Sequence, residues 1–289
     1  MDGSKNPSQK ECLRAYSIFT SAADGDFAVP DPVQAQPLHD QSALAQSALA
    51  QSALSQSALS QSGQDQLVAA DSLDQRRSSI AAAPWTWLRQ VHGGRVVVVE
   101  QPGEFAGAEA DAAVTAASDA VLCVQTADCA GVLFAGFSEK EKPTRSEESC
   151  VVAVGAAHAG WRGVAEGILQ STVDALIALG AQRVVWELGP CISPEAYEFG
   201  ESELAALVDR FGESLRGRTD SGAPALDLRA AVSAALSETP AVYRGAQRIP
   251  CTATDPGFFS WRARQDSKRQ TSAIWMTANS SPETAGVQW

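Results

Sequence analysis

The sequence predicts a single α+β domain with a mixed β-sheet core and flanking helices. Short runs of β-branched residues, typical of buried strands, recur after residue 84. Segments with helical spacing of apolar side chains fall between some of these runs, but strands and helices do not alternate as they would in a parallel α/β sheet. The chain has 289 residues, 45% of them hydrophobic, which is enough for one large domain with a well-buried core.

Residues 1–70 are predicted to be a poorly ordered N-terminal segment, with a first strand within 13–20. Residues 41–60 consist of four copies of a five-residue unit, QSALA or QSALS. Successive leucines of this repeat would lie about 140° apart on a helix, so no single apolar face forms. We therefore expect a solvated insertion there and a catalytic domain over residues 71–289.

The elements of the catalytic domain are predicted from two spacing patterns. Apolar, β-branched runs predict strands at 96–100, 120–125, 132–135, 151–154, 183–188 and 271–276. Helical spacing predicts helices at 164–179, 202–211 and 227–236, and Gly180 is a natural stop after the first. No GxGxxG follows a strand and no GxxxxGK(S/T) occurs, so the sequence contains no standard nucleotide-binding loop.

The net charge and the cysteine content limit the classes of binding partner and the cellular compartment that we expect. The formal net charge of −12 disfavours nucleic acid, because a phosphate backbone would be repelled. The N-terminus is polar, and no apolar run approaches the roughly 20 residues that span a bilayer. The six cysteines form no CxxC pair and are expected to be reduced. We expect a soluble, cytoplasmic protein without a membrane partner. Its oligomeric state is not predicted by these patterns.

Two histidines and one cysteine stand near the ends of predicted strands. His92 precedes a pair of glycines, Cys129 ends the segment TADC, and His158 follows the strand at 151–154. Two imidazoles and a thiolate are a common zinc set, and three protein ligands leave a fourth position open for water or substrate. The structural alternatives are a capping histidine at His158, an inert buried thiol at Cys129 and a structural role for His92. His39 is assigned no role.

Other polar side chains near these residues are candidates for catalysis and binding. Arg162, at the start of a predicted helix between two glycines, could hold phosphate or carboxylate. Asp128 could orient a metal ligand or act as general base, or it could only cap a turn. The loop 258–262, with sequence FFSWR, could stack a planar base or simply anchor itself in the core.

Six segments occur in a characteristic order: QVHG at 90–93, AD at 110–111, TADC at 126–129, HAGWRG at 158–163, GPCI at 189–192 and FFSWR at 258–262. Together they resemble the YfiH-type laccase-domain family, also called multicopper polyphenol oxidase-like or purine nucleoside phosphorylase. The resemblance covers about residues 70–277. It implies a single α+β domain and a metal, usually taken as zinc, held by the residues matching His92, Cys129 and His158. The chain departs from the family pattern at Ala130, where the family has proline, and after Arg262.

The resemblance implies a transferase and hydrolase that takes a purine nucleoside and phosphate. In phosphorolysis, phosphate attacks C1′ of adenosine, inosine, guanosine or methylthioadenosine. In adenosine deamination, water activated by zinc attacks C6. We assign catalytic roles to Cys129, His158, Asp128 and Arg162. Substrate binding is assigned to Gln90, Trp161, Arg162, Phe259, Ser260 and Arg262.

Two other enzymatic functions would use the same residues, and a third alternative is not enzymatic. Cys129 could be a thiolate nucleophile with His158 as base, or zinc could activate water, in an amidase. The family resemblance implies that such an amidase would edit peptidoglycan precursors. Copper-dependent polyphenol oxidation ranks below both, because it needs a His2Cys site and a His-rich cluster, which three histidines cannot supply. A non-enzymatic metal-binding or scaffold protein, with the repeat recruiting a partner, is the fourth interpretation.

Overall fold

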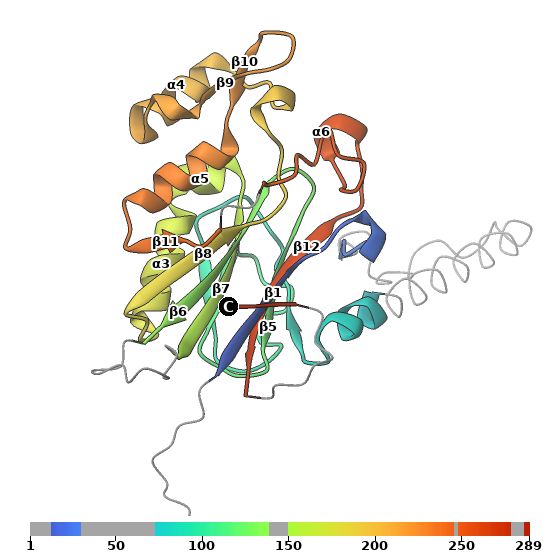
Figure 1. The fold of residues 1–289 in the computed structure, drawn as a ribbon, viewed down its shortest axis with the longest axis vertical. Coiled ribbons are helices and arrows are strands. Elements are labelled where there is room, and N and C mark those ends of the chain that lie inside the picture. Colours follow the sequence, from blue (N-terminus) through green and yellow to red (C-terminus); the bar gives the residue numbers. More distant parts are fainter. Residues whose placement is uncertain (1–12, 30–72, 139–149, 246–247, 279–285) are drawn as a thin grey trace, which may run out of the picture.

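Two β-sheets packed face to face form the centre of the protein, and helices cover the outer face of the larger one (Figure 1). The computed structural model describes residues 13–29, 73–138, 150–245, 248–278 and 286–289. The predicted α+β class with mixed sheets is confirmed.

The larger sheet has six strands in the order β11-β8-β6-β7-β4-β3. Its central neighbours are antiparallel, whereas β3 pairs with β4, and β11 with β8, in parallel. The strands are β3 (Val96–Val99), β4 (Ala112–Thr115), β6 (Ala130–Phe137), β7 (Val151–Ala159), β8 (Arg183–Leu188) and β11 (Ala241–Tyr243).

The smaller sheet has five strands in the order β13-β1-β12-β5-β2. They are β1 (Arg14–Phe19), β2 (Trp85–Thr86), β5 (Val121–Thr126), β12 (Gln270–Thr277) and β13 (Val287–Gln288). A separate ribbon pairs β9 (Arg216–Arg218) with β10 (Pro224–Leu226).

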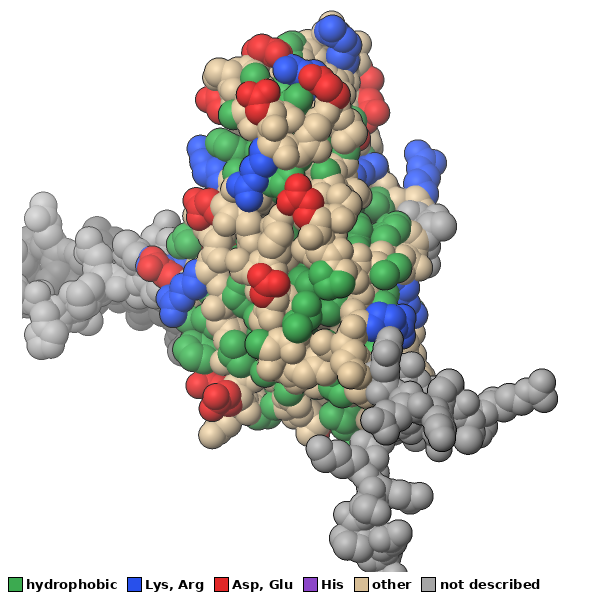
Figure 2. Space-filling view, turned by 90° about the vertical axis from the view of Figure 1, so that its left-hand side faces the viewer, with side chains coloured by type: hydrophobic (Ala, Val, Ile, Leu, Met, Phe, Trp, Pro, Cys, Tyr) green, Lys and Arg blue, Asp and Glu red, His purple; other side chains and the backbone are tan. Residues whose placement is uncertain are grey.

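The α-helices are α2 (Trp161–Glu166), α3 (Ile168–Ala178), α4 (Glu201–Phe211), α5 (Leu228–Ser237) and α6 (Trp261–Arg264), and residues 73–80 are also helical. Short 3-10 helices lie at Ala22–Asp24, Pro194–Ala196 and Glu213–Leu215. Helices α3, α4 and α5 lie on the left of Figure 1. On that face acidic and basic side chains are intermixed, without a continuous basic patch (Figure 2).

Burial on both faces explains why the strand segments read as continuous apolar runs. Along β6, Val132 and Phe134 pack toward the helices, while Leu133 and Ala135 pack toward the second sheet. On β12, Ile274 joins this inter-sheet core, and alternate residues face a third apolar cluster that includes the helix at 73–80. A strand covered on both faces loses the polar alternation of a half-exposed strand.

Some boundaries differ from the sequence-based prediction. The helix expected at 164–179 is two helices, because Gly167 adopts φ 84° and interrupts the hydrogen-bond ladder between α2 and α3. Strand β7 extends to Ala159 instead of ending near Val154. Within the predicted N-terminal segment, residues 13–29 belong to the fold, and the QSALA repeat lies outside the described residues.

The sequence analysis also predicted reduced cysteines and no apolar run long enough to span a membrane. Cys123, Cys129, Cys191 and Cys251 are free thiols, as expected, but Cys150 is disulfide-bonded. The spacing of cysteines along a chain does not show which of them the fold brings together, so this bond was missed. No helix among the described residues is both long enough and apolar enough to cross a membrane.

Neighbouring residues of α3 provide a matched test of the core. Leu176 is fully buried, whereas Ile177 is 42% exposed. We expect Leu176→Ala to lower the free energy of unfolding by about 2–5 kcal/mol through lost burial and a cavity. Ile177→Ala should cost less than about 1 kcal/mol. Urea unfolding followed by circular dichroism measures both, and equal losses would contradict this packing.

Candidate active site and metal centre

Three adjacent strands of the six-stranded sheet bring the chemical residues to one end. Cys129 immediately precedes β6, His158 is the penultimate residue of β7, and Asp111 immediately precedes β4. In the register, Gly131 of β6 lies opposite His158. His158 continues the face of β7 that carries buried Val154 and Ala156, so its ring lies at the end of the inter-sheet core.

The loop that carries His92 is held by one buried carboxylate. Asp111 is 0% exposed and accepts backbone N–H groups from Val91 at 3.2 Å, His92 at 2.9 Å and Gly93 at 2.8 Å. His92 itself has φ 61°, a left-handed conformation that is uncommon outside glycine. The three hydrogen bonds to Asp111 stabilise the turn that needs this conformation.

The same carboxylate orients the second histidine. His158 Nδ1 lies 2.8 Å from Asp111 Oδ1, so Nδ1 carries the shared proton and Nε2 is left for a metal. Burial acts to raise the pKa of Asp111, but the hydrogen bonds from His158 and the backbone outweigh it and lower the pKa below its usual value. Asp111 therefore stays ionised beside the cluster.

His92, Cys129 and His158 converge in space as predicted. Their ligand atoms all lie within 4.8 Å of one another, with Cys129 Sγ 3.9 Å from His92 Nε2. The two imidazole rings meet edge to face at 4.7 Å between centroids. A Cβ at Gly160 would lie 2.9 Å from His92 and 3.3 Å from Cys129 Sγ, so the absence of a side chain there leaves room for the cluster.

Electrostatics favour a thiolate at Cys129. Burial alone would raise the pKa of Cys129, but the charge and hydrogen bond of His158, with a smaller effect of His92, lower it to about 6. Burial likewise acts to lower the pKa of His158, but Cys129 and Asp111 raise it to about 9. A thiolate is the form that ligates zinc and also the form that acts as a nucleophile.

The donor set fits a zinc ion. Zinc takes imidazole nitrogen and thiolate sulfur, and three such ligands are typical of a catalytic site. His158 also has the carboxylate partner that metal-binding histidines commonly use to set their tautomer. These features support a metal site without identifying the metal.

A cavity of about 670 Å³ opens beside this cluster, and the predicted ligands His92, Cys129 and His158 all line it. Its wall includes three large aromatic residues, Trp87, Tyr197 and Trp261, and three arginines, Arg89, Arg262 and Arg269. Gln90 also lines it, although its side chain is bonded to the backbone of Gln125 at 2.7 and 2.8 Å.

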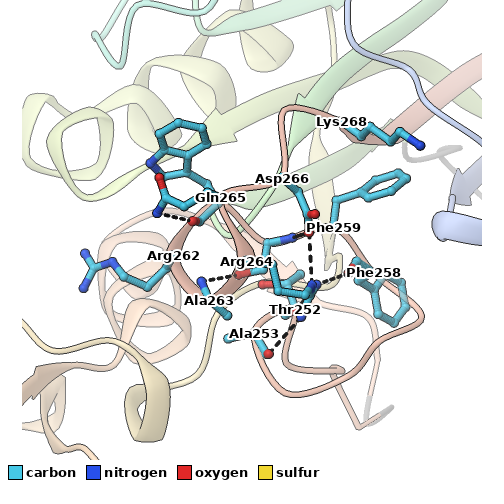
Figure 3. A network of polar contacts seen from close by, with 12 residues as sticks. Thr252, Ala253, Phe258, Phe259, Arg262, Ala263, Arg264, Gln265, Asp266 and Lys268 are labelled. Atoms are coloured by element: carbon cyan, nitrogen blue, oxygen red, sulfur yellow. Dashed lines mark hydrogen bonds and ion pairs between the residues drawn. The ribbon is translucent and has the colours of Figure 1, made fainter.

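Several predicted binding residues lie elsewhere. Neither Trp161 nor Arg162 lines the cavity, and the Arg162 guanidinium stacks 4.5 Å from the Trp161 ring centroid. Phe259 is bonded through its backbone to Gln270, and Ser260 is the buried N-cap of α6. Neither lines the cavity, and the neighbourhood of Phe259 appears in Figure 3.

Asp128 links the cluster to the C-terminal loop. Its carboxylate accepts hydrogen bonds from Thr252 Oγ1 at 2.7 Å and from the backbone N–H of Arg262 at 2.6 Å. It is only 8% exposed, and its φ of 108° is unusual for a non-glycine residue. With both oxygens engaged, Asp128 aligns the loop that presents Trp261 and Arg262 to the cavity.

Sequence reasoning missed Asp111 and several residues of the cavity wall, among them Trp87, Tyr197 and Arg269. The first lies in the AD segment and has a recognisable signal, an acidic residue directly before a buried strand. The other three come from distant segments whose proximity to the cluster is a property of the fold alone.

Residues 49–277 match the family described as multi-copper polyphenol oxidoreductase laccase. The chain is similar to a protein named purine nucleoside phosphorylase Rv2149c of Mycobacterium tuberculosis, with 33% identity over 66% of this chain and 71% of the relative. It is also 36% identical to purine nucleoside phosphorylase SCO2081 of Streptomyces coelicolor, over 66% of this chain and 74% of the relative.

Solved structures show the same fold. Neisseria meningitidis protein NMB0706 aligns with a TM-score of 0.57 at 30% identity, over 72% of this chain and 82% of that one. The hypothetical protein YfiH of Bacillus licheniformis aligns with a TM-score of 0.56 at 24% identity, over 71% of this chain and 81% of that one. The resemblance to the YfiH-type family is confirmed.

Asp111→Asn should weaken zinc binding about 10–100-fold. The amide removes the charged partner of His158, and its NH2 group cannot accept the backbone N–H groups of the His92 loop. Glu109→Gln is a matched control, since Glu109 lies two residues away and pairs with Arg89 on the surface. Competition with a chelating dye measures both affinities. Equal affinities in the two variants would contradict the role of Asp111.

In metal-free protein, Cys129 should be alkylated by iodoacetamide at pH 7. Its rate should fall as the pH drops through about 6, because the thiolate is protonated there. Cys123 and Cys191, whose pKa values burial raises to about 11 and about 12, serve as internal controls. Peptide mass mapping measures each site.

A Cys129 rate that keeps rising from pH 7 to 9 would contradict this assignment. Repeating the reaction with zinc separates the two uses of the thiolate. Protection by zinc supports metal ligation, whereas alkylation without metal loss supports the nucleophile of the amidase alternative.

Proposed function

This chain belongs to the multi-copper polyphenol oxidoreductase laccase family, and we propose that it is a zinc-dependent enzyme that cleaves purine nucleosides by phosphorolysis. The observation that carries the proposal is the His92, Cys129 and His158 cluster on the wall of a cavity with aromatic and cationic side chains. Relatives named purine nucleoside phosphorylase, at 33–36% identity, support the same substrate class.

The cavity has the surface that a nucleoside requires. Ligand sites are mostly apolar and aromatic, with a few polar groups that orient the ligand. Trp87, Tyr197 and Trp261 come from separate segments and offer ring faces on which a purine can stack. Trp261 is 52% exposed, so its indole is available to a ligand without rearrangement of the core.

The metal would be held by His92, Cys129 and His158. When bound, zinc polarises a substrate oxygen or lowers the pKa of a bound water. Asp111 keeps His158 in the tautomer that presents Nε2, and it holds the His92 loop in place. Asp128 was a candidate for proton transfer, but its two engaged oxygens favour a positioning role on the Arg262 segment.

Adenosine deamination is the second activity proposed for this site. Both reactions need a purine beside the cluster, and they differ in whether phosphate attacks C1′ or water attacks C6. Copper-dependent phenol oxidation, which the family's description suggests, is not proposed. It needs a His-rich cluster in addition to a His2Cys site, and only one His/Cys group is found in the described part of the chain.

Zinc-loaded protein incubated with inosine, guanosine or methylthioadenosine and phosphate should release the free base and a sugar 1-phosphate, and adenosine should also yield inosine. His158→Ala should lower kcat/KM at least about 100-fold, because it removes a ligand and a cluster charge. Ile177→Ala, at a 42% exposed position of α3 that does not line the cavity, is the control. Chromatography of the products measures each reaction.

Absence of conversion of every nucleoside by metal-loaded wild-type protein would refute the proposed function. Elemental analysis of the same samples shows whether zinc is present at about one per chain. Thermal melting of His158→Ala separates a loss of chemistry from a loss of fold.

A further inference from the structure

Two cavity arginines lack an acidic partner among the described residues, although the chain carries a net charge of −12. Arg89, the third arginine of the wall, pairs with Glu109. Within the described residues, neither Arg262 nor Arg269 forms an ion pair, because the hydrogen bonds of their guanidinium groups go to backbone carbonyls. Asp128 accepts the backbone N–H of Arg262 and forms no ion pair with its guanidinium. The cavity therefore keeps local positive charge that a ligand can neutralise.

Arg262 is fixed at three points. Its backbone N–H is bonded to Asp128 at 2.6 Å, its Nη1 donates to the Glu198 carbonyl at 2.9 Å, and its guanidinium lies 4.9 Å from the Tyr197 ring centroid. A guanidinium carries five N–H groups, and those on Nε and Nη2 have no hydrogen-bond partner among the described residues. One edge of the planar group is free.

Arg269 shows the same arrangement. Its Nη1 donates to the carbonyls of Asp266 at 2.9 Å and Lys268 at 2.8 Å, which leaves Nε and Nη2 without a partner in the described chain. Its backbone is bonded to Asp26 at 3.0 Å. Ser267, between the two arginines in sequence, also lines the cavity, and its hydroxyl has no partner among described residues.

The loop that carries these groups is held by a fourth arginine. Arg264 donates to the carbonyls of Thr252 at 3.1 Å, Ala253 at 3.0 Å and Phe258, and it pairs with Asp266 at 3.1 Å (Figure 3). These contacts, with those of Arg262 and Arg269 themselves, are all made within the chain, so they fix the two arginines by protein groups alone, which reduces the entropy lost on binding.

We propose that Arg262, Ser267 and Arg269 form the binding site for inorganic phosphate. The identity of phosphate as co-substrate rests on the proposed function. A planar guanidinium edge with two N–H groups matches two phosphate oxygens, and a hydroxyl can donate to a third. Arg162, which the sequence suggested for this role, stacks on Trp161 outside the cavity.

The site meets the needs of the reaction. In phosphorolysis a phosphate oxygen forms a bond to C1′ while the C1′–N9 bond breaks. The electron pair of that bond leaves with the purine, which takes up a proton. Two fixed cations in the cavity hold the anionic nucleophile against the negative field of the whole protein.

The test is phosphate binding to zinc-loaded full-length protein, measured by equilibrium dialysis with radioactive phosphate. Arg262→Gln and Arg269→Gln should each raise the phosphate Kd about tenfold or more. Arg269→Lys, which keeps the charge but not the planar edge, should give a smaller rise. Arg218→Gln, on β9 and outside the cavity, is the charge-matched control and should leave the Kd unchanged. Thermal melting establishes that each variant is folded.

The inference is overturned by wild-type protein that does not bind phosphate, by an unchanged Kd in both glutamine variants, or by loss of binding in Arg162→Gln alone. Kinetics separate this result from the proposed function. Phosphate binding that needs both arginines, without cleavage of any nucleoside, supports the anion site and refutes the reaction. Phosphorolysis with a wild-type KM for phosphate in both variants refutes the anion site and supports the reaction.

Discussion

The site depends on the buried carboxylate of Asp111. It accepts three backbone N–H groups from the His92 loop and shares a proton with His158, so one residue places two of the three proposed ligands. A buried carboxylate without such partners would be costly, because it has left water. Here hydrogen bonds offset that cost. Asp111 directly precedes β4, so its hydrogen bonds to His158 and to the His92 loop fix both imidazoles relative to the sheet.

The second constraint is the inter-sheet core. Strands covered on both faces cannot bend freely, so the end of this layer is a fixed platform for Cys129 and His158. The loops above it are also held by hydrogen bonds. Asp128 connects the cluster to Thr252 and Arg262, and Arg264 closes the loop on itself. The cluster and the cavity wall are thus parts of one hydrogen-bonded assembly.

The chemistry of the cavity contrasts with the composition of the chain. An acidic protein would repel an anionic ligand at long range, but the cavity places beside aromatic rings two arginines that form no ion pair within the described part of the chain. Such a combination suits a ligand pair with a planar apolar part and an anionic part. The chain has few histidines, and its described part contains a single His/Cys centre.

Sequence by itself determined the α+β class, most strands and the three residues, His92, Cys129 and His158, that the fold brings together. Buried apolar runs and rare ligand-type residues are local signals. The N-terminal prediction falls largely outside the described residues and stays a prediction. Only the tertiary structure decided which cations face the cavity. Arg162 and Arg269 have the same chemistry, but backbone direction after β7 turns the first onto Trp161, while the loop before β12 places the second on the cavity wall. That choice depends on contacts between segments far apart in the chain, which residue spacing does not record.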